Sequence, residues 1–305
     1  MNVALIGSVS SSWQVLDAFI RGGVEVTGVL GVDRSQATRI SDYRPLDELA
    51  GPANIPFHPF VKVSEPGVEA FLRAHSADLL WVIGLSQLVP DRLIRLAPAG
   101  GVGFHPTMLP EGRGRAPVAW TILRRARAAV NLFYLAEEAD AGDIIVQREV
   151  PVLPDDYSED LIARTNEVLG EVVLELAPLI RAGRLPRTPQ DHSKATYYPK
   201  RTPADGLIDW TTTTDQVYRL VRAAGRPYPG AFTHCSGRKL TIWRARPAQP
   251  AESTSNRSPG RVLIHRGPGE VLVGTGDGAL WLTEIAGDEA HMDAWSLLEV
   301  DAVLG

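Results

Sequence analysis

Two short segments of the sequence carry side chains that could move a proton between reacting groups. His105 follows the apolar run Gly100 to Phe104 and opens a loop with two prolines and two glycines. Asp140 lies in the acidic run 137–143 and is followed by Ala141-Gly142, a pair that allows a tight turn. If the two loops meet, the carboxylate can hydrogen-bond the imidazole, fix its tautomer and stabilise its charged form. The sequence therefore predicts a histidine general base with an aspartate partner.

Elements of an α/β domain must position these two loops. Short β-rich runs alternate with helix-like stretches, which predicts βαβ units and a Rossmann-like, parallel-rich sheet. The carboxyl ends of strands in such a sheet face the ligand crevice, so we expect both loops at that edge. The predicted strands are residues 1–6, 24–30, 56–61, 78–84, 100–104, 131–136 and 143–150, and the predicted helices are residues 13–21, 66–74, 91–96, 117–127 and 157–180.

The pattern changes after Gly183. A polar, proline-bearing stretch without periodicity follows, and it predicts a linker or a segment that wraps the first domain. Beyond it, one helix-like stretch is followed by short strands separated by regular turns, which favours a small β-rich domain such as a five-stranded OB-like barrel. The predicted domains are a catalytic domain over residues 1–187, a linker over 188–202 and the OB-like domain over 203–305.

Composition narrows the class of protein. A net charge of -5 over 305 residues argues against a nucleic-acid binder, which usually has a basic face. The single cysteine, Cys235, rules out an internal disulfide framework and a multi-cysteine metal site, and we expect no metal. No stretch approaches the roughly 20 apolar residues of a membrane span, and the first residues lack the features of a signal peptide. We therefore expect a cytoplasmic protein with no membrane partner.

The motifs around both loops resemble the folate-dependent formyltransferase family, which includes glycinamide ribonucleotide, methionyl-tRNA and sugar-nucleotide formyltransferases. Residues 103–110 and Arg113-Gly114 match the family pattern Asn-x-His-[Pro/Ala/Gly]-[Ser/Thr]-x-Leu-Pro-x-x-Arg-Gly except at its first position. Asp140-Ala141-Gly142 matches the family's second motif. The resemblance continues through residues 199–210, 222–223, 227–232 and 274–278 and therefore covers nearly the whole chain.

This resemblance implies a catalytic trio. His105 matches the base or proton shuttle, and Asp140 matches its partner. The third member, an asparagine that holds the formyl oxygen, is Gly103 here. Such an amide is commonly worth about 2.7–4 kcal/mol of barrier, so a water, a backbone N–H or another side chain must replace it, or the chemistry has changed. Asn131, on a strand that leads to the site, is the candidate substitute.

The resemblance also implies a binding site for 10-formyltetrahydrofolate. A pterin ring needs donors and acceptors in a mostly apolar slot, and exposed backbone at a strand end provides them. The expected folate-binding residues are Gly84, Leu85, Ser86, Gln87, Leu88 and Val89, with Glu138 and Ala139 from the loop before Asp140. The expected substrate-binding residues are Thr107 and three arginines that could pair with a diphosphate, Arg113, Arg115 and Arg201.

Several functions stay open at this point. The sequence is nearest to enzymes that formylate the amine of a 4-amino sugar on a sugar nucleotide. Initiator tRNA is the alternative acceptor, although residues 33–46 mix arginines with aspartates where a tRNA-binding loop would be basic. A hydrolase that releases formate from formyl-folate, or a non-catalytic folate-binding relative, would also fit a chain with Gly103 in place of asparagine. The sequence is compatible with a homodimer.

Overall fold

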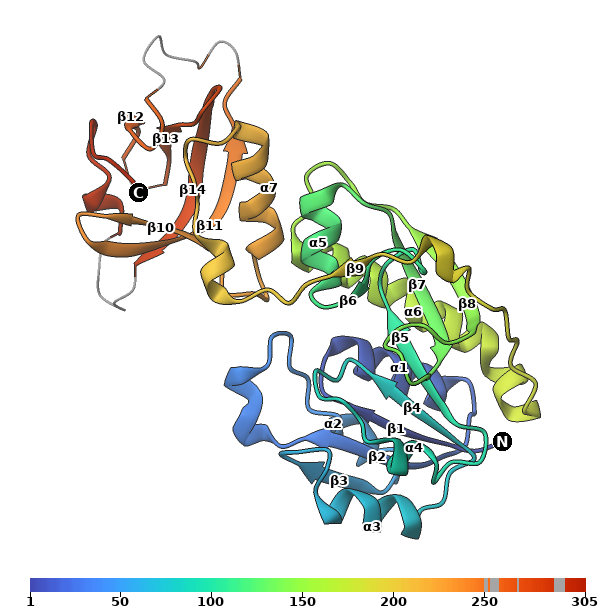
Figure 1. Cartoon of the computed structure of the whole chain (residues 1–305). Helices are drawn as coiled ribbons and strands as arrows, with labels where there is room; N and C mark the ends of the chain where they lie inside the picture. Colours follow the sequence, from blue (N-terminus) through green and yellow to red (C-terminus); the bar gives the residue numbers. More distant parts are fainter. Residues whose placement is uncertain (250–251, 253–257, 268, 288–293) are drawn as a thin grey trace. The chain divides into compact units, whose positions relative to one another are not determined.

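The fold is described from a computed structural model (Figure 1). The structure describes residues 1–249, 252, 258–267, 269–287 and 294–305. The chain divides into two compact units. Unit 1 comprises residues 1–117, 127–151 and 162–199, and unit 2 comprises residues 118–126, 152–161 and 200–305. The domain limits expected from the sequence stay a prediction.

Unit 1 contains nine strands and most of the helices among its described residues. Its strands are β1 (Val3–Gly7), β2 (Val26–Val32), β3 (Phe57–Phe60), β4 (Leu79–Ile83), β5 (Gly101–His105), β6 (Arg113–Gly114), β7 (Ala128–Tyr134), β8 (Ile144–Val150) and β9 (Tyr197–Tyr198). Its helices are α1 (Ser10–Arg21), α2 (Asp47–Ala50), α3 (Pro66–Ala74), α4 (Asp91–Ile94) and the 3-10 helices η1 (Arg34–Arg39) and η2 (His192–Lys194), and the chain of unit 1 also forms part of α5 (Pro117–Arg124) and α6 (Ser158–Ala182).

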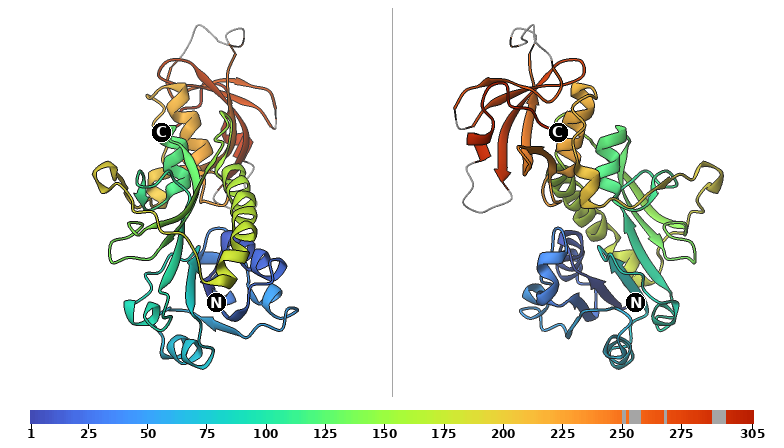
Figure 2. Two further views of the ribbon diagram at one scale, coloured as in Figure 1. Left: turned by 90° about the vertical axis from the view of Figure 1, so that its right-hand side faces the viewer. Right: turned by 60° about the vertical axis from the view of Figure 1, so that its left-hand side comes forward.

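Seven of these strands form one sheet in the order β3-β2-β1-β4-β5-β7-β8. The first five are parallel, and β7 and β8 are each antiparallel to the preceding strand in that order. Phe19 of α1 packs edge-to-face on Trp81 of β4, while Leu72 of α3 and Leu93 of α4 belong to the core cluster that contains Leu80. Helices therefore cover both faces of the sheet, and Figure 2 shows α6 running beside it.

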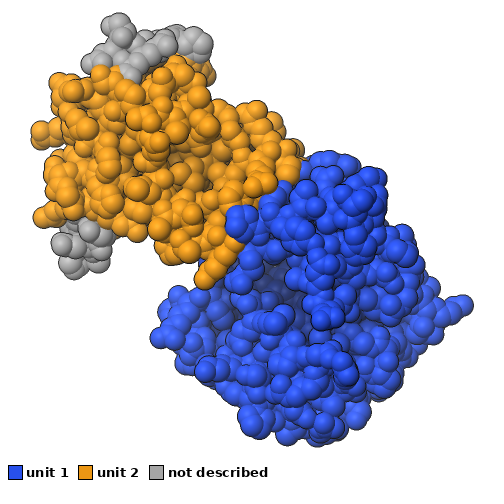
Figure 3. Space-filling model, in the orientation of Figure 1, with its two compact units in different colours: residues 1–117, 127–151, 162–199 blue, residues 118–126, 152–161, 200–305 orange. Residues whose placement is uncertain are grey.

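Unit 2 is built on an antiparallel sheet (orange in Figure 3). Its five strands pair in the order β10-β11-β14-β13-β12. The last residues of the chain connect the two edges of this sheet, because Leu304 pairs with Cys235 and Val303 pairs with Arg261. The elements are η3 (Pro203–Gly206), α7 (Thr214–Ala224), β10 (Ala231–Cys235), β11 (Arg238–Pro247), β12 (Val262–His265), β13 (Val271–Gly274), β14 (Ala279–Gly287) and η5 (Ala294–Leu297).

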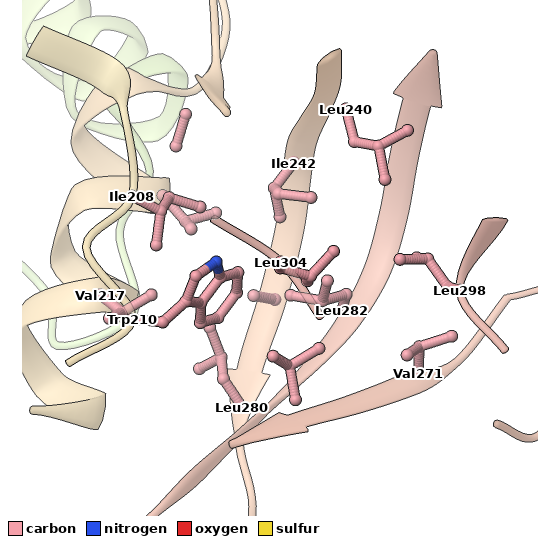
Figure 4. Packing of buried hydrophobic residues seen from close by; sticks show 14 of the residues in the cluster. Ile208, Trp210, Val217, Leu240, Ile242, Val271, Leu280, Leu282, Leu298 and Leu304 are labelled. Carbon is pink, nitrogen blue, oxygen red and sulfur yellow. The ribbon is translucent and has the colours of Figure 1, made fainter. Parts of the chain in front are cut away.

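The apolar core of unit 2 surrounds Trp210 (Figure 4). The indole Nε1 donates to the Thr233 hydroxyl at 3.0 Å, so its one polar group is satisfied in the core. Leu304 joins the same cluster from the C-terminal segment. None of the helices formed by the described residues is long and apolar enough to cross a membrane.

The predicted fold class, a parallel-rich α/β sheet followed by a separate β-rich part, is confirmed. Several element boundaries differ from the predicted ones; for example, the helix expected over residues 13–21 begins at Ser10. The helix expected over residues 117–127 ends at Arg124, because Arg125 adopts a left-handed conformation with φ of 52°. The following strand therefore begins at Ala128, three residues before the expected start at Asn131. The two-residue strands β6 and β9 were not expected at all.

Candidate active site

His105 is the last residue of β5 and its side chain is buried. Its Nε2 lies 2.8 Å from the carbonyl oxygen of Gly112. A carbonyl only accepts hydrogen bonds, so Nε2 carries a hydrogen and donates it. In the neutral ring, Nδ1 is then the nitrogen with a free lone pair. The contact with Gly112 therefore assigns proton acceptance to Nδ1.

Asp140 is the group that faces this nitrogen. Its Oδ2 lies 3.6 Å from His105 Nδ1 and accepts a hydrogen bond of 2.9 Å from the Gly114 backbone N–H. A separation of 3.6 Å is too long for a hydrogen bond but close enough for charge pairing, and catalytic contacts often tighten only when substrate binds. The structure thus brings together the two residues on which the predicted chemistry depends.

The turn that presents Asp140 is unusual for a residue with a side chain. Its φ of 58° lies in the left-handed region, which costs most non-glycine residues roughly 1–2 kcal/mol and which aspartate adopts more readily than most of them. Gly142 is required beside it, because a Cβ there would lie 1.8 Å from the carbonyl oxygen of Tyr134. Gln190 holds the turn by donating from Nε2 to the carbonyl oxygens of Asp140 and Gly142, at 2.8 and 2.7 Å. No pattern in the sequence pointed to Gln190.

Gly103 stands on the same face of β5 as His105, two residues earlier. A Cβ at Gly103 would lie 2.8 Å from the ring of Phe133 and 2.9 Å from a methyl group of Leu135. The space that the family's asparagine side chain would enter is thus filled by two apolar side chains. An asparagine at this position would require both of them to move.

Asn131 is fully buried and pairs with His105 across β5 and β7. Its Nδ2 donates to the carbonyl oxygens of His105, at 2.8 Å, and of Thr107, and its Oδ1 accepts from Gln147 at 2.6 Å. Both N–H groups of the amide are therefore engaged, and none is left for a formyl oxygen. These contacts fix the loop that follows His105, and the role of Asn131 as a substitute for the missing asparagine stays a prediction that they do not support.

Two residues expected to bind substrate are buried and bonded within the protein. Thr107 donates from its hydroxyl to the carbonyl oxygen of Glu111 at 2.8 Å. Arg113 is only 1% exposed, and its guanidinium donates to Gln190 at 2.8 Å and to the Tyr197 hydroxyl at 3.0 Å. The expected phosphate contact of Arg113 is thus unsupported, because the guanidinium is enclosed and already paired.

The other two predicted arginines lie in different units. Arg115 is exposed in unit 1, directly after β6. Arg201 belongs to unit 2, where its guanidinium lies 5.2 Å from the Trp120 ring centre and donates to the carbonyl oxygen of Asp205 at 2.7 Å. Burial lowers the pKa of Arg201 from its ordinary value. Arg115 is therefore the predicted arginine that is open to an anion.

The loop 84–89, expected to bind folate, follows β4. The side chain of Gln87 anchors it by bonding the backbone of Val61 and Val63 at 2.9 and 2.8 Å. Within the part of the chain that the structure describes, the backbone groups of residues 85–88 make no hydrogen bond, and Leu88 is 91% exposed. Free backbone donors and acceptors beside an apolar side chain fit the edge and face of a pterin.

Glu138 and Ala139, from the loop before Asp140, are both exposed. Glu138 accepts a hydrogen bond from the Tyr197 hydroxyl. Among the described residues, no group of three or more His, Cys, Asp or Glu side chains could hold a metal ion.

Comparisons with known proteins give a consistent result. A family model described as "Formyl transferase" matches residues 1–176, and a second, "Formyl transferase, C-terminal domain", matches residues 200–301. Similar solved structures include HypX from Aquifex aeolicus in complex with tetrahydrofolic acid, which is 22% identical with a TM-score of 0.70 over 95% of this chain and 44% of that chain. The chain thus spans less than half the length of HypX.

Two further structures match over most of their own length. An N-formyltransferase from Helicobacter canadensis, in complex with folinic acid and dTDP-3-aminofucose, is 14% identical with a TM-score of 0.66 over 94% of this chain and 100% of that chain. A 4-N formyltransferase from Francisella tularensis is 21% identical with a TM-score of 0.60 over 76% of this chain and 91% of that chain. At these identities the likeness shows the fold.

Proposed function

Because the chain belongs to the formyl transferase family, we propose that it transfers a formyl group from 10-formyltetrahydrofolate to a primary amine. One observation carries this proposal. His105 Nε2 is anchored on the Gly112 carbonyl, while Nδ1 faces the Asp140 carboxylate at 3.6 Å. A buried imidazole with one committed and one free nitrogen is suited to take and return a proton.

In this mechanism the folate co-substrate supplies the formyl carbon. His105 Nδ1 takes a proton from the attacking amine as the new C–N bond forms. It returns that proton to the folate nitrogen as the old C–N bond breaks. Asp140 stabilises the charged imidazole between these two transfers, since a carboxylate beside an imidazolium favours the charged form.

The developing negative charge on the formyl oxygen needs a hydrogen-bond donor. Gly103 has no side chain, and the two N–H groups of Asn131 are donated to the backbone. We infer that a water molecule or a backbone N–H takes this role. The proposed reaction therefore depends on the His105–Asp140 pair and not on a side-chain amide.

For the acceptor, we propose the amino sugar of a sugar nucleotide. The sugar N-formyltransferases among the similar structures support this choice. The structure of the Helicobacter canadensis enzyme contains bound dTDP-3-aminofucose. Exposed Arg115 is available to a diphosphate. A tRNA acceptor, formate release without acceptor, and folate binding without turnover are the competing outcomes.

The test is an assay with labelled 10-formyltetrahydrofolate and a panel of nucleotide-linked amino sugars and initiator tRNA. We expect transfer to an amino sugar, and a fall of about 10²–10⁴-fold in kcat for His105→Asn, the usual contribution of a general base. His234→Asn is the matched control, because His234 is exposed on β10 in unit 2. Full activity in His105→Asn would overturn the mechanism. Formate release alone would identify a hydrolase, and binding without turnover a non-catalytic relative.

A further inference from the structure

We propose that Gln190, oriented by the buried guanidinium of Arg113, is a positioning residue that sets the Asp140 carboxylate against His105. This inference rests on the catalytic pair of the proposed function. Gln190 lies 50 residues beyond Asp140 in the sequence, so the inference adds a distant segment of the chain to the site. We call the segment involved, residues 188–198, the strap.

The strap is bound to the loop between His105 and Arg115 by its backbone. Arg113 N–H donates to Thr196 O at 2.9 Å, Arg115 N–H donates to Tyr198 O at 3.0 Å, and Gly112 N–H donates to the Thr196 hydroxyl at 2.8 Å. The first two bonds belong to the short β6–β9 pair, and the third is accepted by a side chain of the strap. The loop so held supplies the Gly112 carbonyl that fixes His105 and the Gly114 N–H that binds Asp140.

Gln190 connects the strap to the turn that carries Asp140. Its side-chain oxygen accepts from Arg113 at 2.8 Å, which leaves its two N–H groups to point at the carbonyl oxygens of Asp140 and Gly142. Only a primary amide offers one acceptor and two donors in this arrangement. Because both carbonyls flank the left-handed turn, these bonds oppose its relaxation to an ordinary backbone conformation.

Arg113 is placed to orient Gln190 and not to meet a ligand. Besides Gln190 and Tyr197, its guanidinium lies 3.2 Å from His192 Nδ1 and 3.6 Å from the exposed carboxylate of Glu138. A fork of fixed N–H groups holds an amide oxygen in one direction, which a flexible ammonium does not. The consequence is a chain of contacts that runs from Arg113 through Gln190 to Asp140.

Amide hydrogen exchange measured by NMR tests this without any substrate. The proteins compared are wild type, Gln190→Met, Asp140→Ala and the double variant, because methionine keeps the length of the side chain and removes its polar atoms. If Gln190 acts through Asp140, the Gly114 amide exchanges about tenfold faster or more in both single variants, which corresponds to ~1.4 kcal/mol. The double variant then exchanges no faster than Asp140→Ala. The neighbouring Arg113 and Arg115 amides, bonded to the strap, keep their protection.

Two results would overturn the proposal: unchanged exchange at Gly114, or equal loss at all three amides, which means that Gln190 only holds the strap. Lys194→Ala is the matched control, because Lys194 is an exposed strap residue paired with Asp191 at 3.0 Å. Should Gln190→Met fail to fold, Gln190→Asn keeps the amide but shortens its reach, and the same pattern is expected.

Formyl transfer in the same proteins gives the second measurement. We expect Gln190→Met to lower kcat on the order of 10²-fold, the cost of a misplacement of about 1 Å, with KM for both substrates unchanged. The loss should not add to that of Asp140→Ala. If the wild-type protein transfers no formyl group, the proposed function fails, while hydrogen exchange still decides the role of Gln190.

Discussion

At the scale of single residues, Gly103 distinguishes this site from the family pattern. The glycine is not a simple deletion of an amide, because Phe133 and Leu135 occupy the space beside it. Such close apolar packing resists added atoms, since interiors are packed as densely as organic crystals. The absence of a side chain at position 103 thus leaves the space that Phe133 and Leu135 fill.

This packing makes a stability prediction. Gly103→Ala should lower the free energy of unfolding by about 1–3 kcal/mol, the usual cost of forcing atoms into a filled core. Leu135→Ala should relieve part of that cost, so the double variant should be less destabilised than the sum of the single changes. Urea denaturation of the four proteins measures this. Strict additivity would mean that Leu135 does not limit the space at Gly103.

The residues of the site were predicted unequally well, for a physical reason. His105 ends β5 and Asp140 lies in the loop between β7 and β8, so the order of strands and loops read from the sequence indicated where both would lie. Arg113 was predicted to bind a phosphate because its charge can be read from the sequence, whereas the burial of its side chain cannot. Gln190 could not be found, because its contacts with Asp140 arise from the path of the strap and leave no periodicity or spacing in the sequence. The roles assigned to these residues remain proposals.

At the scale of elements, the pairing of β6 with β9 joins the strap to the site. Gly114 permits it in two ways. Its φ is 105°, and a Cβ would lie 2.5 Å from the carbonyl oxygen of Tyr198. Two residues per strand are too few to produce a hydrophobic alternation, which explains why the sequence predicted only a linker or a wrapping segment here.

Gly114→Ala should therefore separate the two strands. We expect the Arg113 and Arg115 amides to lose exchange protection and kcat to fall. Gly237→Ala is the matched control, because Gly237 has a φ of 76° but nothing within 4 Å of its Cβ position. A positive φ strains a side chain at both positions, and the φ of 105° at Gly114 lies farther from the left-handed region near 57°, so we expect the clash and the added strain together to give a larger loss of unfolding free energy at Gly114. Equal losses would argue against it.

At the scale of the whole molecule, each unit has an apolar core of its own. The core of unit 2 includes Leu304, which the final residues bring between the two edges of the sheet. The backbone supports this placement, since His234 and Gly305 exchange two hydrogen bonds of 3.0 Å. The end of the chain is thus a structural part of unit 2.

Leu304→Ala should lower the free energy of unfolding by about 2–5 kcal/mol, as for other buried leucines. Val303→Ala should change it by no more than about 0.5 kcal/mol, because the Val303 side chain is 58% exposed. Urea denaturation followed by circular dichroism compares the two. Losses of no more than about 0.5 kcal/mol in both variants would show that the segment acts through its backbone alone.

The strap is also synthesised after the two residues that we propose it positions. His105 and Asp140 leave the ribosome before Tyr198, the last strap residue, which lies 58 positions beyond Asp140. At the usual 5–20 residues per second, that gap lasts roughly 3–12 s. During this interval the nascent chain holds both side chains of the proposed catalytic pair but not the contacts that we propose to align them. A newly made chain therefore contains His105 and Asp140 before the strap that we propose to align them has been synthesised.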